Sequence, residues 1–449
     1  MRNRFKLCAL SVALALFPSA HAADLLDTYR QAKQNDAVFA AARSQYEADQ
    51  ERLPQGRALL LPRVDLSADT NLNDGQARAQ PSLSFPTGGR EWRYNDHGWN
   101  ITLTQPIFRW QNVMEYRQSA FAVQQAGAIF GQAEQDLIVR VAEAYFDVLA
   151  AQDNIDFVRA NKTAISEQLA QAKRNFEVGT ATITDTNEAQ ARYDLAVSQE
   201  IAAVNALEIA RRALEQITNA EQPLAPLKPN VQLPPPTPND MTQWVGSALY
   251  NNFGVKANEA ALEIANREIE KQRAGHYPTV DAFATYSEDK TNQTISGTAG
   301  NDRLRTEGSI IGLQLNVPLF EGFAVNSRTR QAVALRERAR SDLETARRSA
   351  QFNARQSFLN VNSGLAQTQA LEQAVVSSET ALKSNRVGYE VGVRINIDVL
   401  NAQQQLFQTQ RDLSRARYDT IINGLRLKAA AGTLMEEDVQ QVNRLLAGN

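Results

Sequence analysis

The sequence has very little cysteine and no long apolar run. The only cysteine among 449 residues is Cys8, near the N-terminus. No apolar stretch reaches the roughly 20 residues that a membrane-spanning helix needs. The formal net charge of −3 disfavours nucleic acid as a partner. Glycine and proline are sparse within long stretches rich in Ala, Gln, Glu and Arg, a composition typical of long helices rather than of several compact domains.

The residue patterns that enzymes use for catalysis are also missing. The sequence has three histidines. His21 lies in the N-terminal leader, and His97 and His276 lie beside predicted strands without a nearby cysteine or second histidine. We interpret these two as loop or interface residues rather than metal ligands. No glycine-rich phosphate loop or nucleophile elbow is present. The sequence therefore predicts a protein that is not an enzyme and needs no cofactor or metal.

The N-terminus has the features of a secretory signal peptide. Basic residues precede an apolar run over residues 7–17, and Ala20-His21-Ala22 offers the small-x-small pattern of a cleavage site. We assign residues 1–22 to the signal and expect the mature chain to begin near Ala23. Cys8 is removed with the signal, so the mature protein should have no thiol and no disulfide.

Two similar ten-residue segments stand out in the chain that follows. Residues 176–185 read FEVGTATITD, and residues 389–398 read YEVGVRINID. Each follows a long helical pattern. In each, glycine suits the left-handed position past a helix end, and the final Asp is placed to cap the next helix. We interpret both segments as helix-to-helix turns.

Other landmarks recur at nearly the same spacing. It is 216 residues from Pro62 to Pro278, 212 from Pro106 to Pro318 and 213 from Gly179 to Gly392. This spacing predicts a duplicated helix–strand–strand–helix–helix unit. The expected divisions are a first repeat over residues 23–219, a proline-rich linker over 220–238, a second repeat over 239–431 and a C-terminal tail over 432–449.

Each repeat is expected to contain one pair of strands. Val64 and Leu66 alternate with Asp65 and Ser67, and this period of two is typical of a strand with one apolar face. The predicted strands cover about 64–74, 98–105, 280–290 and 309–317, with a polar loop over 74–96. The predicted helices cover 25–60, 110–176, 186–219, 241–274, a second long helix after the fourth strand, and about 399–431. Apolar residues at heptad spacing along 141–176 indicate packing against neighbouring helices.

The four strands pose a physical problem for a single chain. A four-stranded sheet with open edges cannot cross lipid, because its unpaired backbone groups would have no partners there. Several chains must then share one closed barrel, of about 8 strands for two copies or about 12 for three. Aromatic residues near the strand ends favour an interfacial girdle over ordinary core packing; they are Trp99, Phe108, Trp110, Phe320 and Phe323.

The signal peptide, the duplicated unit, the Val178-Gly179 and Val391-Gly392 turns and the Asp-x-x-x-Ala-Gln segments after them resemble the TolC family of outer-membrane exit ducts. The resemblance covers essentially the whole mature chain. It implies a homotrimer in the outer membrane of a Gram-negative cell, with a 12-stranded barrel continued by a helical coiled-coil tunnel across the periplasm. It also implies a periplasmic adaptor and an inner-membrane pump or ABC transporter as partners.

The function that this resemblance implies is a passive exit channel for efflux or type I secretion. The alternative from another class is a structural or adhesive periplasmic coiled-coil protein without a pore. The alternating strands favour the channel, because a purely structural rod has no use for hairpins with one apolar face. The sequence does not specify the cargo.

The resemblance also implies a gate at the two turns. Thr184 and Asp185 would face Tyr389 and Arg394, Asp398 would point into the constriction, and Asn401 stands where similar proteins often carry a second acidic residue. The competing interpretation, compatible with the first, is that both Asp residues cap helices, Asp185 in a capping box with Glu188. The tips that would meet the adaptor are Val178, Gly179, Thr180, Val391, Gly392 and Val393.

Overall fold

The structure is a computed structural model that describes residues 22–78, 89–229, 231–295 and 301–447. The predicted signal peptide lies, except for Ala22, outside these residues. Within the described ranges, no helix is both long and apolar enough to cross a membrane.

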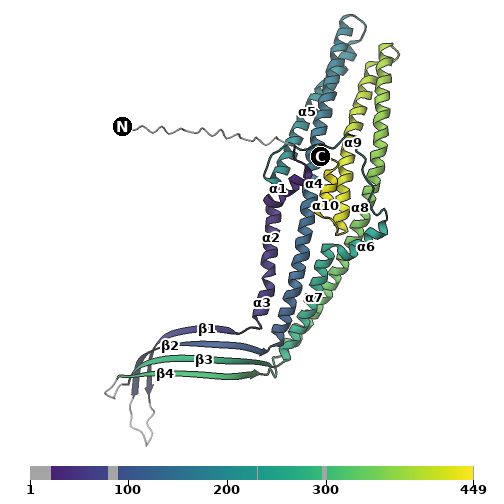
Figure 1. The fold of residues 1–449 in the computed structure, drawn as a ribbon. Coiled ribbons are helices and arrows are strands. Elements are labelled where there is room, and N and C mark those ends of the chain that lie inside the picture. The colour runs from purple at the N-terminus through teal and green to yellow at the C-terminus, as the bar shows by residue number, and fades with distance from the viewer. Residues whose placement is uncertain (1–21, 79–88, 230, 296–300, 448–449) are drawn as a thin grey trace, which may run out of the picture. The chain divides into compact units, whose positions relative to one another are not determined.

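The elements in chain order (Figure 1) are α1 (Leu25–Asn35), α2 (Ala37–Gln50), α3 (Arg52–Ala58), β1 (Arg63–Arg78), β2 (Gly89–Phe108), α4 (Trp110–Glu177), α5 (Ile183–Thr218), α6 (Met241–Asn251), α7 (Phe253–Arg273), a 3₁₀ turn (Ala274–His276), β3 (Thr279–Ile295), β4 (Asn301–Asn316), α8 (Ala324–Glu390), α9 (Asn396–Ala430) and α10 (Glu436–Asn443).

The chain forms two compact units, and both repeats contribute to each. One unit contains residues up to Ala42, Gln132–Asn252 and the chain from Ala350 onward. The other contains Arg43–Gly131 and Phe253–Ser349, and therefore holds the strands. The long helices α4 and α8 each run from one unit into the other.

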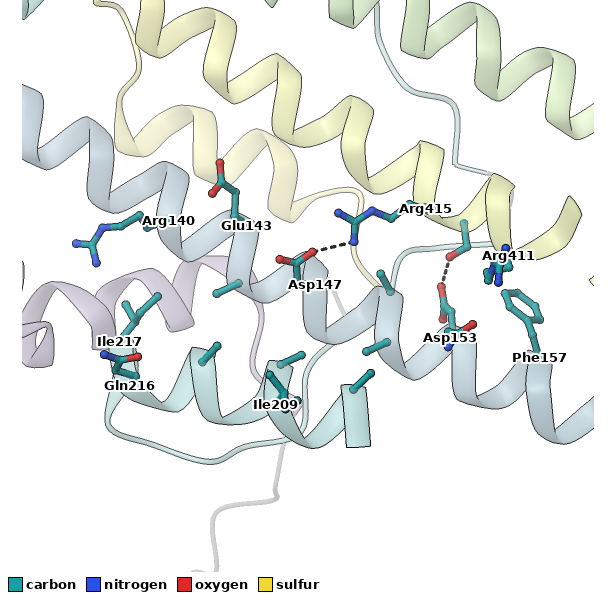
Figure 2. A pocket seen from close by; sticks show the side chains of 18 of the residues that line it. Arg140, Glu143, Asp147, Asp153, Phe157, Ile209, Gln216, Ile217, Arg411 and Arg415 are labelled. Atoms are coloured by element: carbon teal, nitrogen blue, oxygen red, sulfur yellow. Dashed lines mark hydrogen bonds and ion pairs between the residues drawn. The ribbon is translucent and has the colours of Figure 1, made fainter. Parts of the chain in front are cut away.

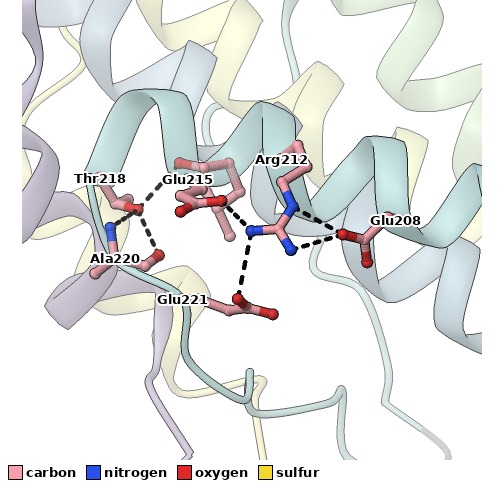
Figure 3. Close-up of polar contacts among 7 residues, drawn as sticks. Glu208, Arg212, Glu215, Thr218, Ala220 and Glu221 are labelled. Carbon is pink, nitrogen blue, oxygen red and sulfur yellow. Dashed lines mark hydrogen bonds and ion pairs between the residues drawn. The ribbon is translucent and has the colours of Figure 1, made fainter.

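The core of the first unit uses the heptad positions of α4. Val148 and Ile155 pack with Ala203, Leu207 and Leu214 of α5 in one buried cluster. The small alanine lets the two helices approach closely, as in a coiled coil. The partner helix α5 ends at Thr218, near which Arg212 forms ion pairs with Glu208, Glu215 and Glu221 (Figure 3).

Two of the helix predictions were wrong. The segment expected as one helix over 25–60 is divided into α1, α2 and α3, and the segment expected over 241–274 is divided into α6 and α7. The tail contains the short helix α10. At the α6–α7 break, the backbone N–H of Asn252 donates to the carbonyl of Ala248 and closes α6, while its side chain donates to the carbonyl of Ala430 at 3.0 Å.

Asp36 explains the first break between helices. Its backbone N–H donates to the carbonyl of Ala32 at 2.8 Å and ends α1, while its side chain accepts from the N–H of Phe39 at 2.8 Å and begins α2. The same carboxylate pairs with Arg140 of α4 at 2.7 Å and is only 5% exposed. Burial opposes ionisation, but the hydrogen bonds from Arg140 and Phe39 outweigh it and hold the pKa of Asp36 below its ordinary value.

We expect Asp36→Asn to lower the thermal stability of the protein at neutral pH. The change removes the charge partner of Arg140, which is 35% exposed, so the loss should be about 1–3 kcal/mol rather than that of a fully buried pair. Because the folded-state pKa is depressed, the contribution is present above the unfolded-state pKa and disappears as the pH falls through the folded-state value. Melting curves should therefore differ at pH 7 and converge in acid; curves that differ equally at every pH would contradict this assignment.

The four strands form one antiparallel sheet in the order β1-β2-β3-β4. Each strand is longer than predicted. Backbone pairing of residues 75–78 with 89–92 continues into the segment 74–96 that is predicted to be a polar loop. The prediction is wrong there because strand pairing does not require alternation of apolar and polar residues. The hairpin ends over 79–88 lie outside the described residues. At the other end, β2 continues past Pro106 through an irregularity in register between Pro106 and Phe108, which is where a residue without an N–H is tolerated.

One face of this sheet is apolar over much of its length. The register places Leu66 opposite Ile101, and Ile101 opposite Tyr286. On the edge strand β4, Ile311 is 86% exposed and Leu313 is 74% exposed. The opposite face carries Asp65, Thr102 and Thr285, with the two threonine hydroxyls 3.2 Å apart. β1 and β4 each have one side without a strand partner among the described residues.

The junction between the strands and α4 is held by a paired charge. Arg109 donates to both carboxylate oxygens of Asp281 on β3, at 2.7 and 2.6 Å. The carboxylate is 11% exposed, and this bidentate pair keeps the pKa of Arg109 above its ordinary value. It joins the end of the first-repeat hairpin to the start of the second-repeat hairpin.

Candidate functional site: the two helix-to-helix turns

The two predicted turns share a backbone geometry. α4 ends at Glu177 and α8 ends at Glu390, and the glycine two residues later has a positive φ in both, 78° for Gly179 and 77° for Gly392. The amide of Thr180 bonds to the carbonyl of Asn175 at 2.8 Å, and that of Val393 bonds to the carbonyl of Gly388 at 2.9 Å. These bonds cap the last helical carbonyls, and the left-handed glycine permits them.

The first turn leads into α5 through a capping box, but not the one predicted. Thr182 is the N-cap residue, and its hydroxyl accepts from the N–H of Asp185 at 3.3 Å. The carboxylate of Asp185 accepts in return from the N–H of Thr182 at 3.0 Å. Asp185 therefore acts from the third helical position, with Thr182 rather than Glu188 as its partner.

The second turn has no such side-chain cap. The N-cap position of α9 is Ile395, whose side chain cannot accept a hydrogen bond. Asp398 lies in the first turn of α9, and its carboxylate is 3.6 Å from the guanidinium of Arg394. A β-carbon on Gly388 would lie 2.7 Å from Cγ of Arg394, so the glycine makes room for the arginine side chain to cross the end of α8.

The two turns are linked by contacts between the repeats. Asn175, in the last turn of α4, donates to the hydroxyl of Tyr389 at 3.3 Å. Lower on the hairpins, Arg192 of α5 donates to the side-chain oxygens of Asn401 at 3.0 Å and Gln404 at 2.5 Å. The predicted residue Asn401 is thus held by the opposite repeat. Further from the turns, the interface between the two repeats includes one apolar cluster of Ile165, Ala196 and Leu400.

These positions differ in part from the expected pairing. Tyr389 does reach the first repeat, but at Asn175 rather than at Thr184, which is exposed. Arg394 pairs with Asp398 of its own repeat, and Asp185 is engaged in its capping box. The pairing of Thr184 and Asp185 with Tyr389 and Arg394 between copies of the chain stays a prediction.

The tips of both turns carry exposed apolar side chains. Val178 is 73% exposed, Val391 67% and Val393 75%. They flank the two glycines, and the space around each glycine α-carbon is open. The tips therefore offer two apolar surfaces of similar shape and unlike charge, since Arg394 has no basic counterpart in the first turn.

Sequence reasoning missed four residues at this site. Asn175, Arg192 and Gln404 form the links between repeats, and Gly388 accommodates Arg394. Asn175 and Gly388 had a recoverable signal, since each lies four residues before the glycine of its turn and supplies the carbonyl that the turn caps. Arg192 and Gln404 are 212 residues apart, and no sequence pattern signalled their contact.

The duplicated unit, its apolar-faced strands and its paired turns define a channel-forming protein of the outer membrane. The chain belongs to the outer membrane efflux protein family, whose model matches residues 28–220 and 244–433. The two matched segments correspond to the two repeats. The family resemblance, the mainly helical fold with a four-stranded sheet, and the outer-membrane location predicted from sequence are confirmed, and members of this family are channels rather than enzymes.

Individual relatives are similar over nearly the whole chain. Outer membrane protein TolC of Vibrio cholerae serotype O1 is 34% identical over 438 residues, covering 97% of this chain and 96% of that protein. The alkaline protease secretion protein AprF of Pseudomonas aeruginosa is 35% identical over 434 residues, covering 96% and 88%. Among solved structures, the CmeC outer membrane channel of Campylobacter jejuni aligns with a TM-score of 0.77 at 15% identity, covering 100% of this chain and 98% of CmeC.

Proposed function

We propose that this protein is a passive exit channel which carries substrates across the periplasm and outer membrane after an inner-membrane pump has supplied the energy. The observation that carries the proposal is the sheet, which has one exposed apolar face and two open edges. In lipid those edges need partners, and further copies of the same sheet can supply them. Three copies make a barrel of about 12 strands, within the range of known outer-membrane barrels.

The names of the relatives support both efflux and secretion as settings for such a channel. AprF and the proteases secretion protein PrtF of Dickeya chrysanthemi are named for protein secretion, whereas BepC of Brucella suis is named for efflux. A periplasmic adaptor and an inner-membrane pump or ABC transporter are the partners that either setting requires. The exposed valines at the two tips are the surfaces we assign to the adaptor.

Membrane fractionation tests this function against the alternative of a rod without a pore. The channel should remain in the outer-membrane fraction after alkaline carbonate extraction, because its strands are embedded in lipid. A periplasmic coiled-coil rod would be released by the same treatment. Release of the folded protein would overturn the proposal.

We further propose that the turns form the closed end of the channel. Thr184 and Asp185 of one repeat would meet Tyr389 and Arg394 of the other in a neighbouring copy. The Arg394–Asp398 pair within one chain has an exposed arginine and is worth little by itself, so Arg394 can exchange Asp398 for another carboxylate at low cost. An exposed pair that can exchange partners suits a latch that an adaptor must release.

Asp398→Asn is expected to reduce the preference of the open channel for cations. Three symmetry-related carboxylates would line the constriction, and a unit charge about 4 Å from an ion contributes on the order of 1 kcal/mol even in water. The ratio of cation to anion permeability should therefore fall several-fold, measured by reversal potentials in a salt gradient. Glu390→Gln, which removes a charge from the exposed end of α8, is the control; an equal change in both variants would contradict a specific role for Asp398.

A further inference from the structure

A groove lies between α4, α5 and α9, below the turns. It has a volume of about 480 Å³, within the range of small-molecule sites. All three helices contribute at heptad-like intervals, with Leu195, Gln199 and Ala202 on α5 as one example. Because α4 and α5 belong to the first repeat and α9 to the second, a molecule in this groove would touch both repeats.

The charged residues of this groove have one sign. Its lining includes Arg192 and Arg411, whereas no Asp or Glu is among the described residues that line it. The remaining polar liners are neutral amides, namely Asn154, Asn161, Gln199, Gln404 and Gln408. The groove therefore favours an anionic group and offers no competing carboxylate.

Arg192 is the cation whose charge is left without a counterion. Its two hydrogen bonds go to the neutral side-chain oxygens of Asn401 and Gln404, and no carboxylate of the described chain lies within ion-pair distance of it. Arg411 differs, because it is 3.3 Å from the carboxylate of Asp412. A guanidinium has five N–H donors in a planar fork that matches a carboxylate. Arg192 can thus accept a carboxylate ligand in exchange for amide partners.

The rest of the lining is suited to an apolar body. Phe157 of α4 and Phe407 of α9 both face the groove, together with Leu195, Leu400 and several alanines of α5. These aromatic and aliphatic side chains fit a ligand whose body is largely apolar.

A neighbouring groove on the same helices differs in that its acidic residues already have partners. Figure 2 shows two of its acidic residues already engaged: Asp147 pairs with Arg415 at 2.9 Å, and Asp153 accepts from Ser414. The hydroxyl of Tyr418 also donates to Asp153, at 2.7 Å. The arginines that line that groove have carboxylate partners within the chain, so it gives no reason to expect an anionic ligand.

We propose that the groove between α4, α5 and α9 is a binding site for a small amphipathic carboxylate. The carboxylate binds the guanidinium of Arg192, and the apolar body lies against Phe407 and Phe157. The site goes beyond the exit-channel function, because a ligand here is bound in the wall and is not required to be cargo.

Binding of 2-naphthoate to the purified full-length protein in a neutral detergent tests this site. Calorimetric titration should show saturable binding of 2-naphthoate and at least about tenfold weaker binding of the neutral isostere 2-naphthamide, the factor that a charge-assisted hydrogen bond supplies. Arg192→Gln should weaken 2-naphthoate binding by a similar factor. Arg212→Gln, a change at an exposed arginine of the same helix that has carboxylate partners of its own, should leave it unchanged.

Three results would overturn the proposal. They are no saturable binding by the wild type up to the solubility limit of the ligand, equal affinity for the acid and the amide, and an Arg192→Gln variant that binds like the wild type. Oligomeric state and circular dichroism of each variant identify any that fail to fold, and Arg192→Lys, which keeps the charge, should then retain a measurable preference for the acid. Because binding is measured without any conductance, the site and the exit-channel function can fail separately.

Discussion

Arg394→Ala and Tyr389→Ala should each raise the conductance of the channel in planar bilayers. Both side chains lie at the second turn, and Tyr389 already accepts a hydrogen bond from Asn175 of the first repeat. Hydrogen bonds to charged groups contribute about 1.5–3 kcal/mol and neutral ones about 1 kcal/mol. Losing one such contact in each of three copies should shift the closed–open equilibrium by roughly tenfold or more.

The matched control for this gate is Arg386→Ala. Arg386 is an exposed arginine on the same helix, one turn before the end of α8. Removing it changes the charge as Arg394→Ala does, but leaves the turn intact. Unchanged currents in both gate variants, or an equal increase in the control, would count against the assignment of the gate to these residues.

Ile311→Arg should prevent assembly of the channel in the outer membrane, whereas Ile310→Arg should be tolerated. The two residues are adjacent on β4 and face opposite sides of the sheet. Ile311 lies on the apolar face opposite Ala284, and Ile310 lies on the polar face opposite Thr285. An arginine facing lipid near the bilayer midplane costs about 2–4 kcal/mol, and the cost is incurred in every copy.

Assembly is measured as the fraction of protein that enters the outer membrane as an oligomer resistant to unheated detergent. Since the two variants introduce the same side chain at neighbouring positions, strand propensity and net charge are matched between them. Loss of assembly in both, or in neither, would contradict the assignment of the lipid-facing side.

The sequence was informative where structure depends on local pattern and on repetition. Alternation over Val64–Ser67 and the spacing between Gly179 and Gly392 were enough to predict the strands and the paired turns, because side-chain period and left-handed glycine are local properties. The strands run further than the alternation because backbone pairing continues through polar residues.

The predictions from sequence were wrong or incomplete at both local contacts and contacts distant in sequence. Neither glycine nor proline marks the break at Asp36, whose side chain caps α2 and also forms an ion pair with Arg140, more than a hundred residues away. The predicted capping box of α5 pairs Asp185 with Glu188, although Thr182 with Asp185 has the same three-residue spacing and forms the box in the structure. The contacts of Arg192 join the two repeats, so no window of sequence contains both partners.

The difference between the two turns is sharper in the structure than in the sequence. The first turn is closed on itself, because the carboxylate of Asp185 is used by its own capping box. The second has no side-chain cap and holds Arg394 and Asp398 in an exposed pair. We infer that the second turn is the part that rearranges on opening, since it has the weaker local restraint.

Single-channel recording of the purified wild-type protein in a planar bilayer tests the central claim, that this chain forms a gated exit channel, most directly. We predict discrete, cation-selective openings of low conductance that become larger in Arg394→Ala. Protein that is folded and oligomeric, yet gives no openings either as wild type or as Arg394→Ala, would contradict it.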